Sequence, residues 1–299
     1  MMKKVLAMLL AAAMMFSLAA CGGSSSSSAA STDAASSEAG SSTEASSEEG
    51  SSEEASSGES DVARIQAAGE LVMLTNCGFP PFEYIDGTEP AGVDVDICAA
   101  IAEELGVELR VVDMDFDGVI NALVSGKGDI IGAGMTITEE RLQSVDFSDV
   151  YFTSAQYMIL PPDSTIASLA DLAGKSIGVQ TGTTGDLFID GEISDGALKD
   201  TGATLKQYKT GLEASLDLLN GRLDVVVLDQ FPAQTIVSQN EGALKLSDGA
   251  INDSESYALA VNKGSDLLPV VNEVLAGMLE DGSIDELVTF HTENTADAA

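Results

Sequence analysis

The stretches ALVSGKGDIIGAG (122–134) and DLLNGRLDVVVLD (217–229) share one pattern, although they lie far apart in the chain. Each begins as the end of an amphipathic helix and continues with a glycine suited to the left-handed conformation that ends helices. A basic residue and an aspartate follow, and the aspartate opens an apolar run typical of a buried strand. The matching pairs are Gly126 and Gly221, Lys127 and Arg222, and Asp129 and Asp224. One structural unit therefore occurs twice.

The residues around each stretch extend the unit to strand, helix, strand, helix and strand. In the first copy the strands are LVMLT, ELRVV and DIIGAG, and the helices are DVDICAAIAEEL, capped by Asp94, and GVINALVS. In the second copy the strands are SIGVQ, TLKQY and DVVVLD, and the helices are TGTTGDLFI and LEASLDLLN. This alternation predicts mostly parallel sheets with helices on both faces.

Two copies of the unit predict an α/β protein with two βαβαβ lobes. A later strand, YALAVNKG (257–264), must pair with one of the two sheets. A second crossing would return it to the first lobe, so we expect a two-crossing hinge. The expected boundaries are 61–155 plus 250–299 for the first lobe and 156–249 for the second. The cleft between the lobes is the expected ligand site.

The first 60 residues do not continue this pattern. Residues 1–20 hold two lysines, a short apolar run and small residues before Cys21, which is typical of a secretory signal peptide. The motif LAACG resembles a bacterial lipobox, which implies that Cys21 carries lipid and anchors the protein to the membrane. An ordinary cleavage site that contains a cysteine is the alternative.

Residues 21–60 are expected to form a Ser/Glu-rich tether. From Gly22 to Ser60 there are 17 serines and 8 acidic residues among 39 positions, with no Lys, Arg, aromatic residue, Val, Ile or Leu. Such a composition buries too little apolar surface to fold, so the tether is expected to be disordered. No later segment is apolar over the length that a membrane-spanning helix needs.

The charge balance limits the partners of the chain. Its formal net charge is -36, and 11 basic against 41 acidic side chains remain after residue 60. Nucleic acid and acidic membrane surfaces are therefore not expected as partners, and most carboxylates should form a solvated surface. We expect a monomer. Cys77 and Cys98 lack a metal-binding or redox spacing, so no metal or cofactor is expected, and both read as free or occasionally paired thiols.

The candidate site follows from the carboxyl ends of the strands, where ligands bind in open α/β sheets. These ends supply Thr75 and Asn76 with the loop CGFPPF, Phe116, residues 133–136 leading to Arg141, Gln180 with TGTTG, and Asp229. Together they provide one cation, one anion, two aromatic rings and turns with free backbone N–H groups.

Arg141 is one of only four arginines in this acidic chain. With Thr138 as the cap, Arg141 lies in the first turn of a helix, where the helix dipole already attracts anions. A guanidinium beside free N–H groups favours a carboxylate, which fits the bidentate geometry of arginine. A surface residue paired with Glu140 or Asp146 is the alternative.

Asp229 follows the apolar run 225–228. A carboxylate in that position loses much of its hydration and needs a cationic or donor partner. It can also cap the helix that begins near Phe231, and the two roles can coexist. An anion and a cation in one cleft complement a zwitterion.

Five segments carry a resemblance to a known family: TNCGFPPFEY, GVDVDICAAIAEELG, GDIIGAGMTITEER with VDFSDVYF, SIGVQTGTTG and NGRLDVVVLD. Over about residues 61–290 the chain resembles the amino-acid-binding group, family 3, of the solute-binding proteins of bacterial ABC importers, which have the type II periplasmic-binding-protein fold. The resemblance implies an extracytoplasmic lipoprotein, not an enzyme, that binds an L-α-amino acid and delivers it to the permease of its importer.

The resemblance also implies how the ligand backbone is held. Arg141 would bind the α-carboxylate, together with the backbone N–H groups of Thr136 and Thr184. The Gly134 carbonyl, the Thr136 hydroxyl and the Asp229 carboxylate would bind the α-ammonium.

The ligand side chain would lie between Phe79 and Phe116, with Asn76 and Gln180 at its tip. Core packing is the alternative for both rings, and a strand-end turn is the alternative for Asn76.

The expected charge of the ligand side chain depends on a departure from the family pattern. Cation-binding relatives often have an aspartate where this chain has Asn76. We therefore expect a polar or uncharged side chain, unless Asp117 or Glu83 turns inward and supplies an anion. The aromatic-rich C-terminus of the family is also missing, and His291 reads as a surface residue.

Two other functions remain open. An enzyme on the same fold, such as a dehydratase, is disfavoured because the site lacks a Ser/His or Cys/His pair and a metal cluster. Cys77 is the only nucleophile near the site. A sensory lipoprotein that presents its ligand to a membrane receptor would have the same sequence features.

Overall fold

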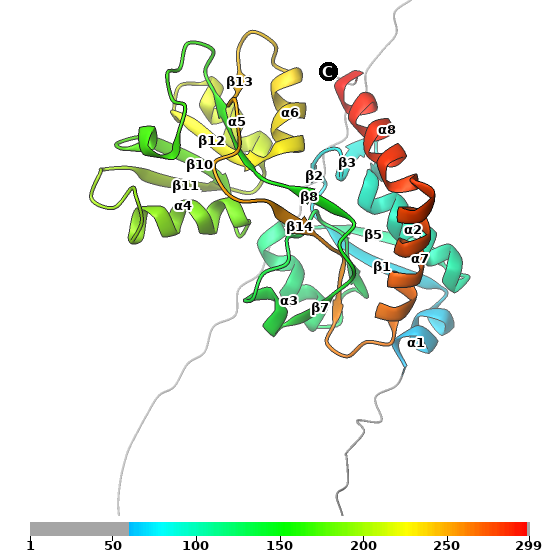
Figure 1. Ribbon diagram of the computed structural model, residues 1–299. Coiled ribbons are helices and arrows are strands. Elements are labelled where there is room, and N and C mark those ends of the chain that lie inside the picture. Colours follow the sequence, from blue (N-terminus) through cyan, green and yellow to red (C-terminus); the bar gives the residue numbers. More distant parts are fainter. Residues whose placement is uncertain (1–59, 298–299) are drawn as a thin grey trace, which may run out of the picture. The chain divides into compact units, whose positions relative to one another are not determined.

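The computed structural model describes residues 60–297, which form two α/β lobes (Figure 1). The predicted signal peptide, Cys21 and all of the predicted tether except Ser60 lie outside the described residues. None of the described helices has the length and hydropathy needed to cross a membrane.

The sheet of the first lobe contains strands from two separate parts of the chain. Their order is β5 (Glu108–Asp113), β1 (Glu70–Thr75), β6 (Ile130–Ile131), β15 (Ala260–Asn262) and β7 (Val145–Phe147). β5, β1 and β6 are parallel, whereas β15 is antiparallel to both of its neighbours. The late strand therefore returns to the first sheet, as the sequence predicts.

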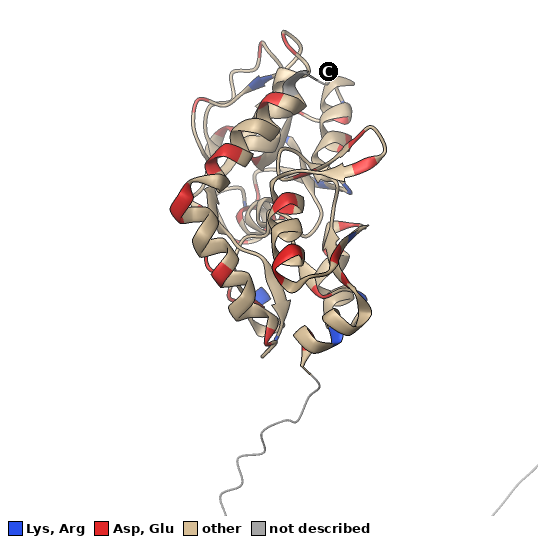
Figure 2. Ribbon diagram, turned by 90° about the vertical axis from the view of Figure 1, so that its right-hand side faces the viewer, with Lys and Arg blue, Asp and Glu red and all other residues tan. Residues whose placement is uncertain are grey.

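Helices cover both faces of this sheet. They are α1 (Asp61–Ala68), α2 (Val93–Leu105), α3 (Val119–Val124), α7 (Leu267–Asp281) and α8 (Ser283–Asp297). Leu71 and Met73 of β1 pack in one apolar cluster with α2 and α7, whereas Leu74 packs with α3 on the other face. Acidic residues are spread along the helices on the face that carries α7 and α8, with few basic residues among them (Figure 2).

The second lobe repeats this plan. Its strands are, in order, β11 (Thr204–Tyr208), β10 (Ser176–Gln180), β12 (Val225–Asp229), β9 (Gln156–Leu160) and β13 (Lys245–Leu246). Its helices are α4 (Thr184–Ser194), α5 (Gly211–Leu219) and α6 (Gln230–Ser238). Along β12, Val226 faces one apolar cluster while Val225 and Val227 face another, so this strand is buried on both sides.

Two strands cross between the lobes, β8 (Phe152–Ser154) and β14 (Glu255–Tyr257), and they pair antiparallel. The α/β fold with two lobes and a two-crossing hinge is therefore confirmed. A smaller sheet in the first lobe holds β2 (Gly78–Phe79), β3 (Glu83–Asp86) and β4 (Glu89–Ala91). Short 3-10 turns complete the fold: η1 (Phe116–Gly118), η2 (Arg141–Gln143) and η3 (Leu169–Leu172).

The repeated stretches make the same contacts in both lobes. Gly126 and Gly221 follow α3 and α5 with φ of 73° and 69°, in the left-handed region that glycine tolerates. The carboxylate of Asp129 accepts the Val72 backbone N–H at 2.8 Å, and that of Asp224 accepts the Ser176 N–H at 2.8 Å. Each aspartate thus joins its strand to the neighbouring strand.

The cap predicted for α2 is wrong. The helix begins at Val93, and Gly92, with φ of 134°, holds the N-cap position. A side chain at Gly92 would meet the Phe82 carbonyl oxygen at 2.1 Å, so only glycine fits there. The Asp94 carboxylate instead accepts the Gly134 backbone N–H at 2.8 Å and the Tyr151 hydroxyl at 2.6 Å.

The surface position predicted for His291 is also wrong. Only 4% of this residue is exposed. Its Nδ1 lies 2.9 Å from the Tyr84 hydroxyl and its Nε2 lies 2.9 Å from the Asp96 carboxylate. His291 therefore joins α8 to β3 and α2.

Candidate functional site

A small cavity lies where the two lobes meet. Its lining residues are Asn76, Phe79, Glu83, Phe116, Ala133, Gly134, Thr136, Arg141, Gln180, Thr183, Thr184 and Asp229. All nine ligand-binding residues predicted from the sequence are in this set, and Glu83, Ala133 and Thr183 are additional. The structure brings the nine together, while their roles toward a ligand stay predictions.

Arg141 is buried in this cavity, with 8% of the residue exposed. Its Nη1 donates to the Thr136 carbonyl at 2.7 Å, and its Nη2 donates to the Gly182 carbonyl of the second lobe at 3.1 Å. The guanidinium carbon lies 5.4 Å from the centroid of the Phe116 ring. Asp146, an alternative partner weighed from the sequence, pairs with Lys263 instead.

The helix predicted after Thr138 is only the single turn η2. Its N-cap position is Glu140 and not the predicted Thr138, although Thr138 Oγ1 accepts the Arg141 backbone N–H at 3.1 Å. The chain then enters β7, where Val145 pairs with Asn262. One turn has no appreciable macrodipole, so the helix-dipole argument for an anion at Arg141 is wrong, and its buried guanidinium is the charge that matters.

Asp229 ends β12, and 4% of it is exposed. It holds the N-cap position of α6, but its side chain makes no cap hydrogen bond. Oδ2 accepts from Gln156 Nε2 at 2.8 Å, and Oδ1 accepts from the Tyr257 hydroxyl. Burial raises the pKa of Asp229 to about 7, the nearby Glu255 adds to the shift, and these two hydrogen bonds oppose it.

Glu255 of the hinge strand β14 accepts hydrogen bonds from residues of both lobes and lies near Asp229. Its Oε2 accepts from Thr136 Oγ1 at 3.0 Å and from Thr184 Oγ1 at 2.5 Å. Gln156 Nε2 lies 3.3 Å from the same oxygen, and Asn252 Nδ2 donates to Oε1 at 2.5 Å. Sequence reasoning missed Glu255, since no local pattern distinguishes it from the other acids of the chain.

Asn76 of the first lobe and Gln180 of the second are hydrogen-bonded to each other. Gln180 Nε2 donates to Asn76 Oδ1 at 2.9 Å, and Asn76 Nδ2 donates to the Met114 carbonyl at 2.8 Å.

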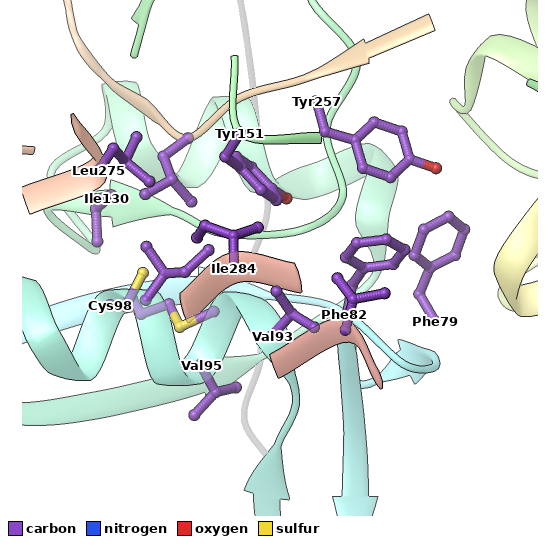
Figure 3. Close-up of a cluster of buried hydrophobic side chains, with 14 of the residues drawn as sticks. Phe79, Phe82, Val93, Val95, Cys98, Ile130, Tyr151, Tyr257, Leu275 and Ile284 are labelled. Carbon is purple, nitrogen blue, oxygen red and sulfur yellow. The ribbon is translucent and has the colours of Figure 1, made fainter. Parts of the chain in front are cut away.

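Phe79 is 7% exposed, and the centroid of its ring lies 6.4 Å from that of Tyr257. Figure 3 shows Phe79, Phe82 and Tyr257 gathered at one end of the apolar cluster, so Phe79 belongs to both the core and the cavity wall.

Glu83 is an acid of the cavity wall that the sequence analysis treated only as a conditional partner. It is fully buried, and neither carboxyl oxygen has a hydrogen-bond partner among the described residues. Burial raises its pKa well above the ordinary value, and Asp94 and Asp229 add to the shift. Asp117, the other acid considered, is exposed.

Within residues 60–297, no group of three or more His, Cys, Asp or Glu side chains is arranged to hold a metal ion. Cys77 and Cys98 are both free. Burial raises the pKa of Cys77 to about 12, with Asp113 adding to the shift, so this thiol is a poor nucleophile at neutral pH.

Comparisons with known proteins identify the family of the chain. Residues 71–292 match the model of the bacterial extracellular solute-binding proteins, family 3. The chain is 32% identical over 220 residues to the arginine-binding extracellular protein ArtP of Bacillus subtilis (strain 168), a match that covers 73% of this chain and 84% of that relative. It is 33% identical over 214 residues to a probable histidine-binding protein of Campylobacter jejuni, covering 70% and 80%.

A solved structure is similar over the same region. The amino acid ABC transporter substrate-binding protein AbpA of Streptococcus pneumoniae, bound to L-arginine, is 30% identical with a TM-score of 0.73. The match covers 78% of this chain and 99% of that one.

Proposed function

The chain belongs to family 3 of the bacterial extracellular solute-binding proteins, and we propose that its cavity holds one L-α-amino acid between Arg141 and Asp229. It is an amino-acid-binding protein of the ABC-transporter type and not an enzyme. The residue roles, the ligand side chain and the mode of membrane attachment are our proposals.

The observation that carries the residue roles is the placement of two opposite charges in one cavity. Arg141 belongs to the first lobe and Asp229 to the second, and both line the space between the lobes. A ligand carboxylate would take over guanidinium donors that now reach the Thr136 and Gly182 carbonyls. An α-ammonium would give the buried Asp229 carboxylate the counter-charge that it lacks.

The ligand side chain is proposed to be polar. Phe79 and Phe116 supply flat apolar walls, and Asn76 and Gln180 supply amides. The expectation of an uncharged ligand side chain assumed that no acidic residue lines the cavity. Because Glu83 lines the cavity, the proposal is not restricted to ligands with uncharged side chains.

Delivery to the permease of an ABC importer, attachment to the membrane only through lipid on Cys21, and a monomeric state complete the proposal. AbpA is named as the substrate-binding protein of an amino acid ABC transporter, which supports such a transporter as the partner. The alternative of a sensory lipoprotein uses the same cavity and differs only in the partner.

Calorimetry with each of the common L-amino acids tests the proposal. Arg141→Ala leaves a ligand carboxylate unpaired in a closed cavity, which should cost about 2–5 kcal/mol or roughly 30- to several-thousand-fold in affinity. Arg110→Ala is the matched control, because Arg110 is half-exposed on β5 and pairs with Glu70. Arg141→Ala binding its ligand as tightly as wild type would contradict the proposed role.

A further inference from the structure

Glu255 belongs to the hinge strand β14, which crosses between the lobes beside β8 (Figure 1). We propose that Glu255 is a positioning residue that couples ligand binding to the approach of the two lobes. It stays with the first lobe, and it accepts a hydrogen bond from Thr184 of the second lobe only while the lobes are together. This inference rests on the amino-acid-binding function proposed above and concerns how the two walls of the cavity are brought together.

Main-chain pairing fixes Glu255 to the first-lobe segment that lines the cavity. The Ile137 backbone N–H donates to the Ser256 carbonyl at 3.0 Å. Thr136, whose hydroxyl donates to Glu255 Oε2 at 3.0 Å, forms an antiparallel bridge with Tyr257. Because the backbones on both sides of this contact are paired, the bond between Thr136 and Glu255 should persist when the lobes separate.

The contact of Glu255 with the second lobe is made by side chains. Thr184 is the first residue of α4, and its hydroxyl donates to the same Oε2 at 2.5 Å. The helix packs against β10, β11 and β12, so it moves with the second lobe. A displacement of Thr184 by more than about 1 Å would stretch the bond beyond hydrogen-bonding distance. This bond is therefore specific to the arrangement in which the lobes are together.

Glu255 is also linked to the proposed ligand-binding carboxylate of Asp229. Gln156 lies between the two acids and has no exposed surface. Its Nε2 donates to Asp229 Oδ2 at 2.8 Å and lies 3.3 Å from Glu255 Oε2. A buried amide shared by two carboxylates holds both in place, since such networks are rigid when their members are paired. The bond between Thr184 and Glu255 therefore stabilises the arrangement that an α-ammonium at Asp229 needs.

A double-mutant cycle of Thr184→Val with Glu255→Gln tests the coupling by calorimetry on the full chain. The probe is the common L-amino acid that wild type binds most tightly. Valine has nearly the shape of threonine and keeps the Thr184 backbone N–H proposed for the ligand carboxylate. Each single variant should lower the affinity roughly tenfold, through a weakened or lost hydrogen bond to a charged acceptor. The double variant should bind within about threefold of each single variant, because both changes affect the same bond.

Thr136→Val is the matched comparison, because the bond of Thr136 to Glu255 should exist with and without ligand. Its effect on affinity, through loss of the predicted hydroxyl contact with the α-ammonium, should add to that of Glu255→Gln. Thr184→Ser keeps the hydroxyl group and should bind the probe as wild type does. Thr153→Val, at an exposed position of β8 opposite Ser256, controls for a valine in the hinge.

Stopped-flow kinetics supply a second measurement that a purely structural role would not change in the same way. The bond between Thr184 and Glu255 forms only after the lobes have come together. Thr184→Val should therefore raise the dissociation rate of the probe roughly tenfold and leave its association rate unchanged within about twofold.

The outcomes separate this inference from the function on which it rests. Additive effects of Thr184→Val and Glu255→Gln, or equal affinities of Thr184→Val and Thr184→Ser, would overturn the role of Glu255 and leave amino-acid binding intact. Coupling of Thr136→Val to Glu255→Gln as strong as that of Thr184→Val would overturn it too. Failure of wild type to bind any common L-amino acid would overturn the function itself. If Glu255→Gln does not fold, the affinities and rates of the two Thr184 variants decide the matter alone.

Discussion

Gly78 stands where the lobes touch, and Gly78→Ala should weaken ligand binding by opposing their contact. A methyl group at Gly78 would lie 2.7 Å from Thr210 Cγ2 and 3.2 Å from Thr210 Cβ. Gly78 belongs to β2 of the first lobe, and Thr210 caps α5 of the second. Thr210 Oγ1 accepts the Glu213 backbone N–H at 3.2 Å, so the threonine cannot rotate away without losing its cap.

The size of the effect follows from this overlap. Gly78 is outside the left-handed region, so alanine adds no backbone strain there. Forcing a methyl group into a filled contact costs about 1–3 kcal/mol. If both lobes hold the ligand together, the added methyl group destabilises the ligand-bound state, in which the lobes touch. The affinity should then fall roughly 5- to 150-fold.

Calorimetry measures the affinity, and small-angle scattering measures the compaction that ligand binding should cause. Thr210→Ser removes the clashing Cγ2 and keeps the capping hydroxyl, so it should restore affinity in the double variant. Gly191→Ala on α4, which has no neighbouring atom within 4 Å of the added methyl, is the matched control. Unchanged affinity and compaction in Gly78→Ala would refute the reasoning.

Burial raises the pKa of Asp229 to about 7, so the ligand-free protein should lose stability as the pH rises from about 4 to 7, since the folded state retains a proton that the unfolded state releases. Asp229→Asn should flatten that part of the melting-temperature profile, and an equal slope in both proteins would contradict this assignment. Glu255→Gln weakens a charged acceptor shared by Thr136 and Thr184, so ligand affinity should fall about tenfold by calorimetry, and an unaltered Kd would exclude the link. Cys21→Ser should release the protein from cells into the medium, and continued partition into the detergent phase would argue against a lipid anchor.

The repeat and the strand ends were predictable because local sequence patterns indicate them. Asp129 and Asp224 hold equivalent positions in two copies of one pattern, and they make equivalent contacts. Parallel strands place their carboxyl ends at one edge of a sheet, so locating the strands was enough to bring Arg141, Gln180 and Asp229 to one cavity.

The remaining features depend on contacts between distant parts of the chain. Asp94 reads locally as a cap, but its partner is the backbone of Gly134, 40 residues away. His291 is buried only because Tyr84 and Asp96, about 200 residues earlier, lie against α8. The local sequence does not distinguish Glu83 from the other acidic residues, because its place at the cavity depends on the pairing register of β2 and β3. No local pattern reports such contacts.

The discontinuous sheet of the first lobe has a consequence for the order in which the chain folds. β7 is joined to its sheet only through β15, which lies between it and β6. The sheet of the second lobe needs only residues 156–246. Pulse-labelling hydrogen exchange during refolding should therefore protect the amides of β9 to β12 before those of β7. During synthesis from the N-terminus, the second lobe can fold before residues 260–262 of the first lobe have been made. The first lobe therefore begins to form earlier than the second lobe but completes its sheet later.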